Sequence, residues 1–195
     1  MNDLLILGAG LGTGTIILIA VAVLVVFIIM YFISTYNGLV NLREFVRNAM
    51  SNIAVQVESR WDALKSLIDA TKKYSEHEAQ VLTEITRARG GITKNSSAKE
   101  VEKDDEMFTQ AMNRLNVVVE NYPELKASDL YTKTMDSINQ YENNVRMSRM
   151  VYNDSVTKLN RTIQQFPSSI VAGMFGFTQE SYFQNTASKA EMPQW

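Results

Sequence analysis

The chain has 195 residues, of which 46% are hydrophobic, and a formal net charge of −2 at pH 7. This balance argues against a nucleic-acid binder that acts through bulk positive charge, so we expect no nucleic-acid partner. With no cysteine and one histidine, the chain cannot form disulfides, cysteine nucleophiles or a metal site that needs two histidines.

The first predicted element is a membrane-spanning helix, an unbroken apolar run from Ile16 to Ile33. At 1.5 Å per residue this run is roughly 27 Å long, close to the hydrocarbon thickness of a bilayer. No charged side chain stands between Leu4 and Leu42, so the basic region of a cleaved signal peptide is missing. We therefore expect residues 1–34 to hold a retained single-pass anchor that contacts the lipid bilayer through residues 16–33.

The arginines near the span predict its orientation. Arg43 and Arg47 follow the span and no lysine or arginine precedes it. By the positive-inside rule, the amino terminus lies outside and the body is cytoplasmic.

A long helix is predicted directly after the span. Apolar residues recur three and four positions apart from Leu39 to Ala88, which is typical of one helix face. Gly90 and Gly91 are suited to end this helix. We expect one continuous helix from about residue 15 to residue 89.

Two further long helices are predicted by their end signals. A capping box begins at Ser97, and Pro123 ends that second helix. Ser128 or Asp129 can begin a third helix, which Pro167 ends. A short helix can follow, capped by Ser168 or Ser169. The predicted fold class is therefore all-α.

Comparison of the helix lengths predicts the arrangement. The second helix is too short to return to the membrane, so residues 35–183 are expected to form an antiparallel up-down-up bundle, with a disordered tail over 184–195. The membrane-proximal part of the first helix then lacks a partner and would expose an apolar stripe to water. We expect this stripe to drive formation of a homo-oligomer; it comprises Leu39, Leu42, Val46, Ala49, Ile53 and Val57.

The same arrangement puts the carboxyl-terminal aromatic residues at the end of the bundle farthest from the membrane. They are Phe175, Phe177, Tyr182 and Phe183. Aromatic side chains in such a position seal the end of a core or contact a partner or a second membrane.

Polar residues fall on or beside the apolar faces of the predicted helices. They are Gln56, Arg60, Tyr152, Asn153 and Asn160. Such residues commonly fix the register between helices, and a shared cluster that recognises a partner is the alternative.

Residues for catalysis or for cofactor binding are not evident in the sequence. His77 and Glu78 have no cysteine, second histidine or glycine-flanked serine to act with. The acidic run from Glu100 to Glu106 lacks the spacing of a calcium loop and is interpreted as a solvated helix start. We expect a protein that is not an enzyme and binds no metal or cofactor.

Short motifs in a fixed order give the chain a resemblance to the LemA family of bacterial membrane-anchored proteins. They are Tyr36-Asn37-x-Leu39-Val40-x-Leu42-Arg43, Val55-Gln56-Val57-x-x-Arg60, His77-Glu78, Ala88-Arg89, Glu120-x-Tyr122-Pro123-x-Leu125-Lys126-Ala127, Tyr152-Asn153-Asp154, Phe166-Pro167 and Ala172-Gly173-x-Phe175-Gly176-Phe177. The resemblance implies one amino-terminal membrane helix, an antiparallel helical bundle and location in a bacterial cell membrane. It implies no established activity.

Three functions remain open at this stage. The first is a non-enzymatic, membrane-anchored scaffold or adaptor that self-associates and presents its bundle to a partner, such as another membrane protein. The second is a membrane-remodelling or lipid-contacting module. The third is a regulatory subunit of a membrane protease.

Overall fold

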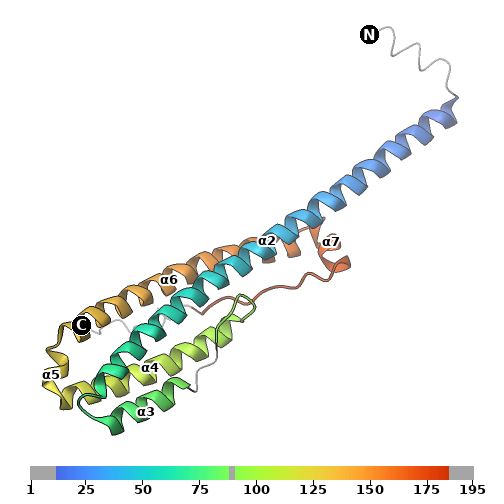
Figure 1. Cartoon of the computed structure of the whole chain (residues 1–195). Helices are drawn as coiled ribbons and strands as arrows, with labels where there is room; N and C mark the ends of the chain where they lie inside the picture. Colours follow the sequence, from blue (N-terminus) through green and yellow to red (C-terminus); the bar gives the residue numbers. More distant parts are fainter. Residues whose placement is uncertain (1–11, 88–90, 185–195) are drawn as a thin grey trace, which may run out of the picture.

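The computed structural model describes residues 12–87 and 91–184, and in that part of the chain every regular element is a helix (Figure 1). The all-α class is thereby confirmed. The helices are α2 (Thr13–Thr71), α3 (Glu76–Arg87), α4 (Ala98–Asn121), α5 (Pro123–Lys126), α6 (Asp129–Gln164) and α7 (Ser168–Met174). The predicted disordered tail over 184–195 lies outside the described residues, apart from Gln184.

Helix α2 contains both the predicted membrane span and the central helix of the bundle. It is long and apolar enough to cross a membrane, and its most apolar stretch of 18 residues is not buried against the rest of the chain. No proline interrupts it, so nothing breaks its backbone hydrogen bonding between the span and the bundle. The predicted continuity of anchor and bundle is confirmed as far as Thr71.

The predicted extension of this helix to residue 89 is wrong, because the chain turns after Thr71. The Thr71 carbonyl accepts hydrogen bonds from the Tyr74 and Ser75 amides, both at 2.9 Å. The Ser75 hydroxyl then accepts a hydrogen bond from the Glu78 amide at 3.3 Å, the geometry of a helix start. The polar stretch that begins at Lys72 carries no apolar face to hold the helix straight, so α3 folds back along α2.

This turn reverses the direction of every later helix relative to our expectation. Helix α3 returns toward the predicted span, α4 runs away from it, and α6 runs back along α2 (Figure 1). Hydrogen bonds from Asn144 to Gln56 and from Arg60 to Glu142 fix the antiparallel pairing of α6 with α2. The bundle is therefore up-down-up-down, and its carboxyl-terminal segment lies near the predicted span.

The predicted starts of α4 and α6 are confirmed in detail, but the predicted cap of the short helix is wrong, because the N-cap of α7 is Pro167 and no side chain caps it. The Ser97 amide donates to the Glu100 carboxylate at 2.6 Å, and the Glu100 amide donates to the Ser97 hydroxyl at 3.3 Å. Hydrogen bonds from the Ser97 backbone and hydroxyl lower the pKa of Glu100. Ser128 caps α6 by accepting a hydrogen bond from the Tyr131 amide.

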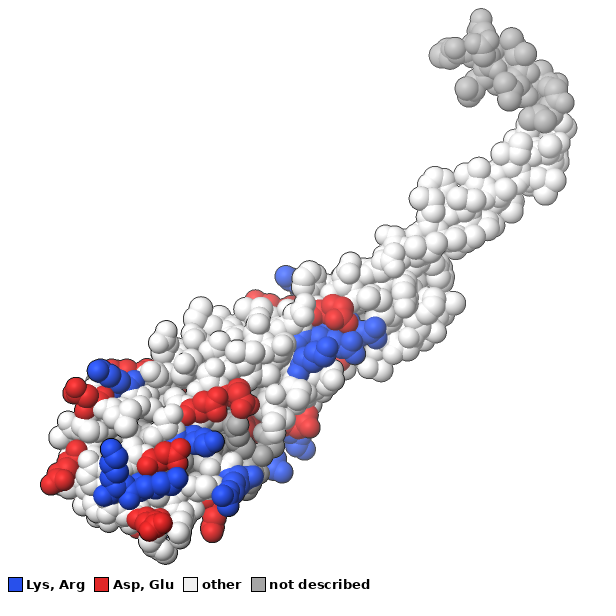
Figure 2. Space-filling view, in the orientation of Figure 1, with Lys and Arg blue, Asp and Glu red and all other residues white. Residues whose placement is uncertain are grey.

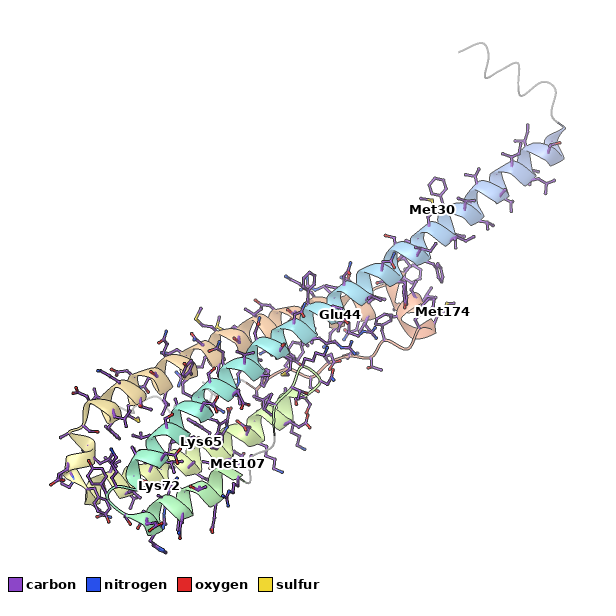
Figure 3. The ribbon with its side chains drawn as sticks, in the orientation of Figure 1. Met30, Glu44, Lys65, Lys72, Met107 and Met174 are labelled. Atoms are coloured by element: carbon purple, nitrogen blue, oxygen red, sulfur yellow. The ribbon has the colours of Figure 1, made fainter. Side chains whose placement is uncertain are left out.

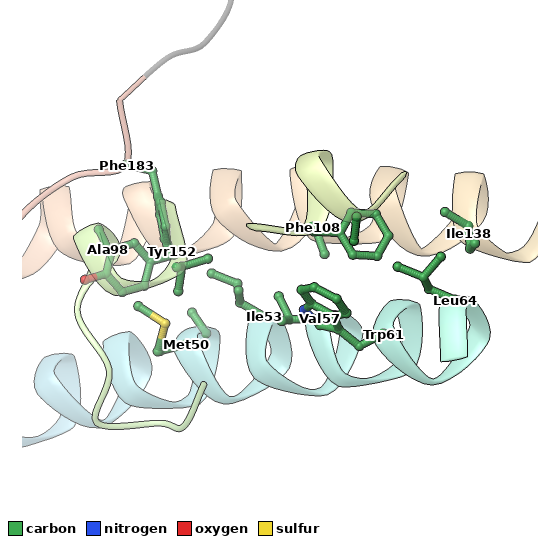
Figure 4. Close-up of a cluster of buried hydrophobic side chains, with 14 of the residues drawn as sticks. Met50, Ile53, Val57, Trp61, Leu64, Ala98, Phe108, Ile138, Tyr152 and Phe183 are labelled. Carbon is green, nitrogen blue, oxygen red and sulfur yellow. The ribbon is translucent and has the colours of Figure 1, made fainter. Parts of the chain in front are cut away.

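The core runs along the contact between α2 and α6, with α4 packed across it. Figure 4 shows Met50 of α2 opposite Tyr152 of α6, with Ile53 and Val57 farther along α2 and Trp61 near Phe108 of α4. The Trp61 and Phe108 rings meet edge to face, with centroids 5.0 Å apart. Such contacts add to the burial of apolar area that stabilises the bundle.

The apolar stripe predicted to face water is instead covered by the chain itself. Because α6 returns to the membrane-proximal end, it packs along α2 where no partner was expected. Leu42 is half-buried and the other members are buried, namely Leu39, Val46, Ala49, Ile53 and Val57. The stripe is thus part of the monomer core and cannot be the surface of self-association.

Candidate functional site

A polar cleft of about 600 Å³ lies between α4 and α6 and is the main candidate site. Arg60 of α2 and Asp105 of α4 line it together with Glu142, Arg146 and Arg149 of α6. Phe183 and Gln184, from the extended chain after α7, also line the cleft. The walls of the cleft therefore come from three helices and from the extended chain after α7.

Arg60 is the centre of this site. Its side chain is 1% exposed, and its guanidinium donates to Asp104 at 2.9 Å, Asp105 at 2.8 Å and Glu142 at 2.6 Å. Asp104 also accepts a hydrogen bond from the Trp61 indole at 3.0 Å. A buried guanidinium with three carboxylates joins α2, α4 and α6 through charge-assisted hydrogen bonds.

Electrostatics keep Arg60 charged despite its burial. Burial alone would lower the pKa of Arg60, but the charges of Glu142 and Asp105 and their hydrogen bonds raise it above the ordinary arginine value. Its guanidinium also lies over the Phe108 ring, 4.3 Å from the centroid, a favourable cation–π distance. Arg149 binds the other side of Asp105.

Two asparagines of α6, the half-buried Asn153 and the buried Asn160, hold the extended chain that follows α7. Asn153 accepts from the Phe183 amide at 2.9 Å and donates to the Phe183 carbonyl at 3.2 Å. Asn160 makes the same pair of hydrogen bonds with Glu180, both at 2.9 Å. Each side-chain amide thus pairs with one residue of the tail as a neighbouring strand would.

The predicted polar residues therefore act mainly between elements of the chain. Gln56 bridges α2 to α6 through Asn144 at 3.1 Å. Tyr152 is 2% exposed and packs against Phe183, with ring centroids 5.0 Å apart. Burial, and then the charge of Glu180, raise the pKa of Tyr152 to about 12.

The four carboxyl-terminal aromatic residues do not lie at the membrane-distal tip, where they were expected. Phe177 is half-buried beside Tyr36 and Arg43 of α2, and Phe183 is buried in the core. Phe175 and Tyr182 remain exposed. Phe183 thus packs in the core beside Tyr152, at a position along the bundle that the reversed helix direction explains.

A second, apolar groove of about 300 Å³ lies between α2 and α6. We call it the α2–α6 groove, and its lining residues are Ala49, Asn52, Met147, Ser148, Met150, Val151 and Asp154. Met147 and Met150 are strongly exposed there, and exposed Phe45 precedes Ala49 by one turn. Methionines on such a surface adapt to the shape of a partner.

Sequence reasoning missed the carboxylates that surround Arg60. The acidic run of α4 was interpreted as solvated, but Asp104 is 1% exposed and Asp105 is half-buried. Asp105 interrupts the apolar spacing of its helix while Arg60 interrupts that of α2. These opposite charges on two apolar faces were the available signal.

The chemistry of the site is that of an ion-pair network. Among the described residues there is no group of three or more His, Cys, Asp or Glu side chains arranged to hold a metal ion. His77 lies exposed on α3, away from the cleft. The residues of the cleft can hold three helices together and present charged groups to a partner.

Comparison with known proteins matches the chain to one protein family and to several curated relatives. The model of the LemA family matches residues 49–195. Magnetosome protein MamQ 2 of Paramagnetospirillum magneticum is 26% identical over 189 residues, which cover 82% of this chain and 70% of that protein. Protein LemA of Metamycoplasma hominis is 27% identical over 173 residues, covering 81% and 78% of the two chains.

Proposed function

The chain belongs to the LemA family, and on that premise we propose that it is a non-enzymatic, membrane-anchored scaffold. It pairs with a second copy of itself in the same membrane and presents its bundle to partner proteins. The observation that carries this proposal is the continuity of α2, which is both membrane span and central helix of the bundle. An unbroken helix holds the bundle at a fixed position on the membrane.

The α2–α6 groove supplies the surface for pairing. It is apolar, and its exposed members Met147, Met150 and Val151 lie on the outer side of the helix pair. Exposed apolar surfaces of this kind mark sites of protein interaction. This surface takes the place of the buried stripe in our original expectation.

A second copy is the occupant that fits the groove best. Two chains anchored in one bilayer stand parallel, so a two-fold axis along the membrane normal brings identical grooves face to face. Confinement to the membrane also raises the effective concentration of the two grooves. In such a pair Met150 of one copy approaches Met150 of the other.

Cross-linking in native membranes tests this pairing directly. The chain has no cysteine, so Met150→Cys introduces a single reactive site. A short bismaleimide should then give a cross-linked dimer of the full-length protein. The matched control is Val117→Cys, at another strongly exposed apolar position, on α4 away from the groove. Equal cross-linking of the two variants, or none at Met150→Cys, would contradict the proposal.

The proposed orientation has the bundle in the cytoplasm of a bacterial cell. It is supported by Arg43 and Arg47, which follow the apolar run with no lysine or arginine before it. A Lys94→Cys variant should resist a membrane-impermeant maleimide in intact cells and react after lysis. Reaction in intact cells would contradict this orientation and indicate that the bundle lies outside the cytoplasm.

A further inference from the structure

The end of the bundle that faces the membrane carries an exposed apolar surface. We call it the α7 face, and its members with their exposed fractions are Phe166 (82%), Ile170 (49%), Met174 (65%) and Phe175 (54%). Ile170 and Met174 stand four residues apart in α7, which puts them on one side of that helix, and Phe166 lies just before its start. Val171 and Ala172 are buried in the bundle on the other side. The segment is thus apolar both toward the core and away from it.

Contacts with α2 fix the level of this surface relative to the membrane. The Tyr36 ring contacts the rings of Phe175 and Phe177, with centroids 4.7 and 5.9 Å apart. Tyr36 follows Ile33, the end of the apolar run, by only about 4.5 Å along the helix axis. In Figure 3, Met174 lies at a level between Met30 of the span and Glu44.

The bundle even overlaps the last turn of the span. Phe32 belongs to the apolar run, yet it is half-buried and packs against the core of the bundle. Residues 13–31 of the same helix are all exposed. This end of the bundle therefore reaches the level of the last turn of the predicted span.

The charge pattern agrees with a lipid environment. No charged side chain stands between Arg161 and Glu180, and none stands between Leu4 and Arg43. On the face shown in Figure 2, the upper part of the long helix is free of charged atoms and the charges begin on the bundle. Arg43, the first charge after the span, lies over the Phe177 ring at 5.1 Å.

We propose that the α7 face inserts into the interface of the same bilayer that α2 crosses. Apolar faces of interfacial helices sink about 5–10 Å into the boundary between headgroups and acyl chains. Aromatic residues such as Tyr36 and Phe175 suit this level of the membrane. The bundle then has two lipid contacts, and the second one sets the tilt and rotation of α2.

Spin labels on the full-length protein in nanodiscs of phosphatidylcholine and phosphatidylglycerol test this insertion. Three single-cysteine variants are compared, Met174→Cys on the α7 face, Met30→Cys in the span and Val117→Cys on α4. All three positions are strongly exposed in the monomer. Power saturation measures the accessibility of each label to oxygen, which concentrates in lipid, and to a water-soluble nickel chelate.

Insertion predicts that the Met174 label resembles the Met30 label, with high oxygen accessibility and at least several-fold lower nickel accessibility than the Val117 label. A Met174 label as accessible to nickel as the Val117 label would overturn the proposal. A Met174 label shielded from both reagents would overturn it too, because a protein surface would then cover the α7 face. As a second variant, Ile170→Asp should return a label at Phe166→Cys to the water-accessible pattern, and an unchanged label would count against insertion.

Discussion

Asn153 and Asn160 stand two turns apart on α6 and hold two tail residues, Phe183 and Glu180, that are three positions apart. Seven residues of helix rise about 10.5 Å, and three residues of extended chain span about 10 Å. The two spacings match, so both amides can bind the tail backbone at once. This match fixes the register of the tail, which closes one end of the polar cleft.

Loss of either amide should therefore release the tail locally. In Asn153→Ala the buried backbone groups of Phe183 lose both partners, at a cost on the order of 2 kcal/mol. Hydrogen exchange at the Phe183 amide should accelerate by at least tenfold, with little change in the α2–α6 core. Asn143→Ala, at an exposed position of the same helix, is the matched control. Equal exchange in both variants would refute the clamp.

Among the residues of the cleft, Arg60 should be the one whose substitution destabilises the folded protein most. Arg60→Met leaves Asp104 buried without its cation, which typically destabilises a protein by about 3–5 kcal/mol. Guanidinium unfolding of the full-length protein in nanodiscs, followed by circular dichroism, measures the loss. Arg47→Met breaks the exposed pair with Glu44 and should cost no more than about 1 kcal/mol. Similar losses in the two variants would contradict the role of the network.

A double variant can separate the contribution of the buried charges to stability from the contribution of side-chain packing. Asp104→Asn combined with Arg60→Met removes both buried charges. If charge imbalance causes the loss in Arg60→Met, the double variant should recover part of it, because no uncompensated buried carboxylate remains at position 104. Additive losses in the double variant would instead indicate that packing dominates.

Tyr152 should govern part of the stability at alkaline pH. Because its pKa is raised to about 12 in the folded protein from about 10 in the unfolded chain, the folded state favours the protonated phenol. This contribution is fully present below pH 10 and is lost as pH rises from about 10 through about 12, on the order of 2 kcal/mol.

Tyr152→Phe removes this titration. Its free energy of unfolding should fall less between pH 10 and 12 than that of the wild type. Tyr182→Phe, at an exposed tyrosine, controls for the other groups that titrate in this range and should follow the wild type. A Tyr152→Phe profile that parallels the wild-type profile would show that the buried phenol does not matter.

Local signals in the sequence predicted the elements of the fold well. The apolar run ending at Ile33, the capping box at Ser97 and the cap at Ser128 each depend on residues close in sequence. All three appear in the structure as expected. Helix type and helix starts are encoded by such local patterns.

The path of the chain was harder to predict, because one turn decides it. The polar stretch after Thr71 looked compatible with a continuing helix, and its reversal inverts every helix that follows. The membrane-proximal partner of Leu39 and the position of Phe175 both depend on that reversal. The pairing of Arg60 with Asp104 depends on contacts between distant segments, which spacing within one helix does not reveal.

The oligomeric state of the full-length protein tests the scaffold account most directly. Native mass spectrometry after release from mild detergent should give a species at twice the 22.0 kDa chain mass. Met150→Asp puts a charge in the α2–α6 groove and should convert that species to the monomer, whereas Val117→Asp should leave it intact. A wild-type protein that is monomeric, or a dimer that survives Met150→Asp, would contradict pairing through the groove.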